Sequence, residues 1–205
     1  MYLNNLLSAN FDLGIMPNPD RERTEQNEFH EKPSHIEFHN DSERILRSSL
    51  RSVDPEEGCA LLIGNSIKLE NESMPNVFHI QLIWPCCNVW TNKIPHHVSK
   101  NSLNENTHKE LISRKNRFAL DPKEQLLAQK WARTKDLKIL GTAHSHPQSK
   151  PIPSKIDIKN CFWLNLMIII NGYNDMRAWW INQENFVHPL ELPFGSINKN
   201  NIIEL

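Results

Sequence analysis

The feature that most constrains this chain is an apolar run that ends in two histidines one residue apart. Residues 135–143 (KDLKILGTA) have the β-branched and apolar content of a buried strand, and they lead directly into His144 and His146. Side chains at positions i and i+2 of a strand point to the same face of a sheet. The sequence therefore predicts a strand that presents both imidazoles to one cavity.

A helix start follows the histidines and supplies a carboxylate. After the proline-rich loop 147–153, Ser154 is a good N-cap residue, and Asp157 lies in the first turn, where the helix dipole favours an acid. Two imidazoles and one carboxylate are the protein ligands of a hydrolytic zinc site that keeps its fourth position for water. We therefore expect one Zn²⁺ per chain, held by His144, His146 and Asp157.

The spacing of these residues resembles the signature of a known family. The pattern His144-x-His146-Pro147-x6-Ser154-x2-Asp157 is similar to that of the JAMM (MPN-type) zinc metallopeptidases, and the compact chain looks most like a small bacterial-type member. A phenylalanine and an Asp-Pro pair before a helix, here Phe118 and residues 121–122, also resemble this family. The resemblance covers roughly residues 36–182.

The resemblance also implies a catalytic glutamate upstream of the histidines. Residues 54–64 (DPEEGCALLIG) are similar to the family segment that carries the general base, and alignment of the cysteine places Glu57 in that position. Ala60 stands where small members usually carry glycine. By the same resemblance, the Ser154 hydroxyl would donate to the developing oxyanion, and Cys59 would be a packing residue, since no protein nucleophile is needed.

For the fold, the resemblance implies an α/β (α+β) class with a single MPN/JAMM domain, a curved mixed sheet flanked by helices as in cytidine deaminases. The expected organisation is a flexible N-terminal extension (1–34), the domain (35–182) and a C-terminal tail (183–205). Local patterns predict the elements within the domain. Strands are expected near 35–39, 59–63, 77–84, 166–170 and 176–181, and helices near 41–53 and 122–133.

The substrate implied by the resemblance is a peptide or isopeptide bond after the C-terminal Gly-Gly of a ubiquitin-like sulfur-carrier protein. The peptide tail is expected to add to the edge of the strand leading into His144, or of its neighbour. Two alternatives stay open: a catalytically silent MPN scaffold that only binds partners, and a RadC-like protein linked to DNA repair. RadC-like chains typically read H-N-H-P-S-G, whereas residues 144–149 read HSHPQS.

Composition bounds the remaining possibilities. A formal net charge of −1 gives no electrostatic reason to expect nucleic acid or a membrane surface as partner. The apolar run 166–170 is too short to span a bilayer, and the start of the chain lacks the pattern of a secretory signal. Four cysteines without a disulfide pattern favour a reducing, cytoplasmic location. Residues 91–117 are expected to be an insertion loop, and His96, His97 and His108 solvated loop histidines.

Overall fold

The computed structural model describes residues 32–67, 76–91, 113–161, 165–182, 185–190 and 192. The predicted N-terminal extension and the three loop histidines therefore fall almost entirely outside the described residues. The helices are α2 (Ser42–Arg51), α3 (Pro122–Thr134) and α4 (Lys155–Asn160). The strands are β1 (His35–Phe38), β2 (Cys59–Ile67), β3 (Val77–Cys86), β4 (Lys138–His146), β5 (Leu166–Asn171), β6 (Met176–Ile181) and β7 (Val187–Leu190).

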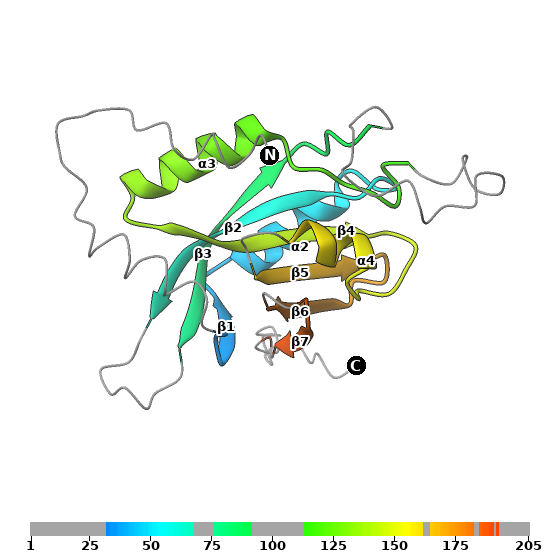
Figure 1. Ribbon diagram of the computed structural model, residues 1–205. Helices are drawn as coiled ribbons and strands as arrows, with labels where there is room; N and C mark the ends of the chain where they lie inside the picture. The colour runs from blue at the N-terminus through cyan, green and yellow to red at the C-terminus, as the bar shows by residue number, and fades with distance from the viewer. Residues whose placement is uncertain are drawn as a thin grey trace, which may run out of the picture.

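Within the described residues, the seven strands form one mixed sheet in the order β1-β3-β2-β4-β5-β6-β7. The pairs β1/β3 and β4/β5 are parallel, and the other neighbours are antiparallel. Figure 1 shows the sheet curving, with helices against it. The predicted fold class, a curved mixed sheet flanked by helices in one α/β domain, is confirmed. Strand β7 lies inside the segment expected to be a tail and pairs with β6.

Successive side chains of β2 point to opposite faces of the sheet. Leu62 packs into the main core, which also contains Leu46 and Leu50 of α2. Leu61 and Ile63 point to the other face, where they pack with the buried residues of α3. The period of two in a strand produces this division, and Figure 1 shows α2 and α3 on opposite sides of β2 and β4.

The helices form where the sequence predicts them, but their buried faces differ in part. The helix expected near 41–53 ends at Arg51 as α2, and Val53 beyond its end is 46% exposed. In α3, Asp121 accepts a bond from the backbone N–H of Lys123 as N-cap, and proline begins the helix as expected. The buried residues of α3 are alanines, because the helix lies close to the sheet, and both of its leucines, at 126 and 127, are more than half exposed.

Strand β4 lies at the centre of the sheet. It begins at Lys138 rather than at 135, because α3 continues to Thr134 and Asp136 takes a left-handed conformation with φ of 54°. It pairs with β2 on one side and β5 on the other, and each of these has a second neighbour. The hypothesis that a substrate tail adds to the edge of β4 is therefore wrong next to the histidines, because residues 141–144 pair with β2 on one side and with β5 on the other. None of the described helices has the length and apolar character needed to cross a membrane.

Candidate metal centre

The two histidines project from the end of β4 toward the same point, as the i, i+2 spacing predicts. His144 pairs with Cys59 on β2 and with Ile169 on β5, so it lies between two buried strands. Both histidines are buried, and their Nε2 atoms are 3.0 Å apart. Ser145, between them, points to the opposite face of the sheet, toward α2.

The third member of the cluster is positioned by the start of α4. Ser154 is the N-cap: its Oγ accepts from the Asp157 backbone N–H at 3.2 Å, and its own N–H donates to Asp157 Oδ2 at 2.7 Å. This reciprocal capping box fixes the Asp157 rotamer. The same Oδ2 atom lies 3.7 Å from His144 Nε2 and 3.6 Å from His146 Nε2. Local helix chemistry thus aims the carboxylate at the histidine pair.

The three ligand atoms fit a tetrahedral zinc ion. Zinc bonds of about 2.0–2.1 Å place neighbouring ligand atoms about 3.3–3.4 Å apart, and the observed separations of 3.0, 3.6 and 3.7 Å bracket that value. His146 donates its Nδ1–H to the Lys150 carbonyl at 2.9 Å, which leaves the Nε2 lone pair for a cation. Two imidazole lone pairs at 3.0 Å repel each other unless a proton or a cation lies between them.

The electrostatics of the cluster also suit a cation. Burial lowers the pKa of His144, which keeps its imidazole neutral. Burial also opposes ionisation of Asp157, but the two histidines and Ser154 outweigh it and hold the pKa of that carboxyl well below its usual range. A neutral imidazole and an ionised carboxylate are the forms that bind a metal. Burial lowers the pKa of His146, but the nearby carboxylates of Asp157 and Glu57 and the hydrogen bond to the Lys150 carbonyl outweigh it, so this pKa is raised.

Glu57 lies directly before β2, next to this cluster. It is 5% exposed, and burial raises its pKa from 4.5 to about 7, while the positive charge of His146 opposes this effect. A carboxyl group whose pKa lies near neutral pH can both accept and return a proton. The adjacent Glu56 differs: its side chain is 45% exposed and lies 3.8 Å from the guanidinium of Arg114.

The backbone around Glu57 is fixed from both sides. Its N–H donates to the Arg114 carbonyl at 2.7 Å. The next N–H, that of Gly58, donates to the buried Ser145 Oγ at 2.8 Å, and this hydroxyl donates to the Leu50 carbonyl at 3.3 Å. A side chain at position 58 would not fit, because its Cβ would lie 2.3 Å from the Leu50 oxygen. Glycine thus lets α2 approach the strand that follows Glu57.

The structure places all five predicted site residues in one region and adds others that the sequence analysis did not assign. Phe118 stacks on the His144 ring, with centroids 4.4 Å apart and planes 25° from parallel. Its phenylalanine-to-Asp-Pro spacing was recognised, but its contact was not. Cys59 is buried, and burial raises the pKa of its thiol. A thiol of raised pKa is a poor nucleophile, in agreement with the packing role expected for it.

The fold and the cluster together define an α/β domain with a candidate hydrolytic metal centre. A family model described as prokaryotic homologs of the JAB domain matches residues 39–182, more than half of the chain. The chain belongs to this family, and the resemblance to small bacterial-type JAMM/MPN proteins is confirmed.

Individual relatives are more distant. The chain is 30% identical over 76 residues to a desampylase of Pyrococcus furiosus, a match that spans 37% of this chain and 54% of that protein. The solution structure of a Desulfitobacterium hafniense protein has a TM-score of 0.55 at 22% identity, over 77% of this chain and 91% of the other. A JAB1/MPN domain protein from Archaeoglobus fulgidus has a TM-score of 0.41 at 17% identity, over 80% and 100%. The likeness to the Desulfitobacterium structure supports the fold alone.

Proposed function

We propose that this chain is a zinc-dependent isopeptidase that hydrolyses the bond after the C-terminal Gly-Gly of a ubiquitin-like sulfur-carrier protein. The observation that carries the proposal is the convergence of two Nε2 atoms and one carboxylate oxygen, within 4.8 Å of one another, beside a buried glutamate. Membership of the prokaryotic JAB family supports the hydrolytic reading. Similarity to part of a protein named desampylase supports a ubiquitin-like substrate.

His144, His146 and Asp157 are the proposed ligands. Zinc held there would supply Lewis acidity and a water of lowered pKa. Glu57 would accept the proton of the attacking water and later return it to the leaving amine, because its pKa of about 7 allows both transfers. Its burial would also keep bulk water from competing for that proton.

Ser154 would stabilise the charge that develops on the carbonyl oxygen. Its Oγ accepts from the Asp157 N–H, so its hydroxyl proton is available to donate. Glycines on the acyl side of the bond would suit a narrow cleft, because a residue without Cβ permits close approach of two chains.

The test separates metal binding from catalysis. Glu57→Gln should keep stoichiometric zinc, measured by metal analysis, while hydrolysis of a carrier with a short C-terminal extension falls by roughly 10²- to 10⁴-fold. Glu56→Gln is the matched control and should retain near wild-type rates, since its side chain is half exposed. If Glu56→Gln abolished activity and Glu57→Gln did not, the assignment of the base would be off by one residue.

The substrate is tested separately with a carrier in which bulky residues replace both glycines. Cleavage should be lost with this carrier and kept with the Gly-Gly form. Equal rates of cleavage for the two carriers would contradict the Gly-Gly specificity. Absence of cleavage of any such tail by the zinc-loaded protein would favour a scaffold that only binds.

A further inference from the structure

We propose that Asn88 is a positioning residue for Glu57. The inference rests on the proposed function, because it concerns the orientation of the proposed general base. Asn88 follows β3 and forms an isolated bridge with Leu120, in the segment that precedes α3. It lies 31 positions from Glu57 in the chain, yet the two residues are in direct contact.

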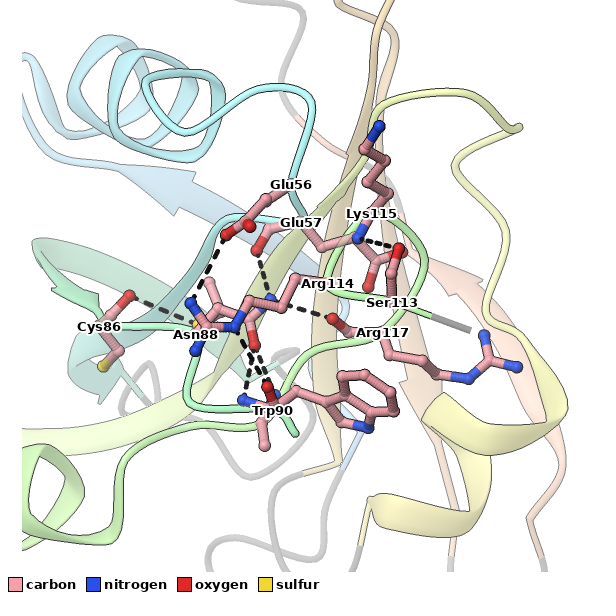
Figure 2. A network of polar contacts seen from close by, with 11 residues as sticks. Glu56, Glu57, Cys86, Asn88, Trp90, Ser113, Arg114, Lys115 and Arg117 are labelled. Carbon is pink, nitrogen blue, oxygen red and sulfur yellow. Dashed lines mark hydrogen bonds and ion pairs between the residues drawn. The ribbon is translucent and has the colours of Figure 1, made fainter. Parts of the chain in front are cut away.

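The Asn88 side chain uses every hydrogen-bonding position that a carboxamide offers. Its Nδ2 group donates to the Glu57 carbonyl and to the Arg117 carbonyl, each at 3.0 Å. Its Oδ1 atom accepts from the backbone N–H groups of Trp90 at 3.1 Å and Ala119 at 3.2 Å. A primary amide has two N–H donors and two acceptor lone pairs, so all four are occupied. Figure 2 shows Asn88 at the centre of these contacts.

These bonds connect Glu57, the proposed general base, to residues 113–120. Residues 113–120 also accept the Glu57 N–H, through the Arg114 carbonyl at 2.7 Å. The Arg114 side chain in turn donates to the Trp90 carbonyl at 3.1 Å. Both peptide groups of Glu57 are therefore held by two segments, residues 88–90 and 113–120, and the side chains of Asn88 and Arg114 join these segments to each other (Figure 2).

Residues 113–120 also contact the metal cluster. Phe118, which stacks on His144, lies between two residues bonded to Asn88, namely Arg117 and Ala119. The capping box positions Asp157 and β4 carries both histidines, and the Asn88 side chain bonds to none of these three residues. Loss of the Asn88 bonds should therefore disturb the base more than the metal.

The isosteric change Asn88→Asp isolates the donor half of this network. A carboxylate retains the two acceptor contacts but cannot donate, and it would face the carbonyl oxygens of Glu57 and Arg117. Repulsion between these oxygens would shift the Glu57 backbone. A displacement of about 1 Å in a catalytic group can reduce the rate about 100-fold.

The first experiment measures kinetics and zinc content of the full chain. Asn88→Asp should lower kcat by about 10- to 100-fold, with KM within about threefold of wild type and zinc content unchanged. Asn65→Asp is the matched control: with its amide nitrogen assigned to the side that faces them, Asn65 also bridges two carbonyls, those of Gly64 and Asp136, at 3.0 and 3.3 Å. It lies at the other end of β2, so its kcat should match wild type.

A double-mutant cycle with Glu57→Gln distinguishes positioning from general structural support. If Asn88 acts through Glu57, Asn88→Asp should lower the residual activity of Glu57→Gln by less than about twofold. A full second loss in that background, or loss of zinc together with kcat in the single variant, would overturn the proposal.

Amide hydrogen exchange tests the same idea without any substrate. In Asn88→Asp, the shift of the Glu57 backbone should make the N–H groups of Glu57 and Gly58 exchange at least about 10-fold faster, while Asn65→Asp leaves them unchanged. Unchanged exchange in Asn88→Asp would refute the positioning role. A wild-type protein that binds zinc but cleaves no carrier would refute the proposed function instead, and the exchange data would still decide the role of Asn88.

Discussion

Glu57 should make the metal-free protein less stable as the pH rises, and Glu57→Gln should remove this effect. Burial raises the pKa of Glu57 from its ordinary 4.5 to about 7. Between these values the folded state keeps a proton that the unfolded state has released. Stability therefore falls as the pH rises through this interval, and it is constant above it.

The size of the effect follows from the same two values. One pKa unit corresponds to about 1.4 kcal/mol, so the interval from 4.5 to about 7 amounts to about 3 kcal/mol of unfolding free energy. Because Gln does not ionise, the stability of Glu57→Gln relative to wild type should rise by that amount between pH 4 and pH 8.

Urea unfolding of the metal-free proteins at several pH values measures the difference directly. Glu56→Gln, which removes a half-exposed carboxylate next to Glu57, is the control for the loss of a nearby charge. Zinc should reduce the advantage of Glu57→Gln, since a cation in the cluster stabilises the ionised carboxylate. A Glu57→Gln difference that is the same at pH 4 and pH 8 would refute the burial of an ionisable Glu57.

Three further predictions concern the framework and the metal. Ser145→Ala leaves the buried Gly58 N–H without its acceptor and should lower the unfolding free energy in urea by about 1–3 kcal/mol. As a control, Ser48→Ala at an exposed position of α2 should change this free energy by less than about 0.5 kcal/mol. Gly58→Ala forces a Cβ against the Leu50 oxygen and should lower stability by about 1–3 kcal/mol, with a loss of activity; wild-type values would show that α2 can move away. Removal of zinc by a chelator should lower the Tm of wild type but not that of His144→Ala, and equal shifts would place the metal elsewhere.

Local sequence rules were sufficient for the proposed ligands. The alternation of a strand placed His144 and His146 together, and the capping preference of serine placed Asp157 in the first turn of α4. Each rule acts over three residues or fewer, so the sequence shows it directly. The strand limits were less accurate, because an aspartate in a left-handed conformation at position 136 delays the start of β4.

Contacts over long sequence distances could not be predicted in this way. The pattern predicts the helix α3, but not that its buried residues are Ala128 and Ala132 while both of its leucines are exposed. Nothing in the sequence around Asn88 indicates that its amide contacts Glu57. The free strand edge expected next to the histidines is not there, because pairing of β4 with both β2 and β5 depends on the order of strands in the whole sheet.

The proposed ligands and the proposed base should differ in their sensitivity to substitutions, because short-range contacts position the ligands and long-range contacts position the base. The proposed ligands depend on one strand and one helix start, whereas the backbone of Glu57 depends on Arg114, Asn88 and Ser145, none of which is close to it in sequence. Substitutions scattered through the chain should therefore disturb the base more often than the ligands. Variants that keep zinc and lose hydrolysis should thus outnumber variants that lose zinc. This asymmetry offers a physical route from an active hydrolase of this fold to a domain that still binds metal but no longer catalyses.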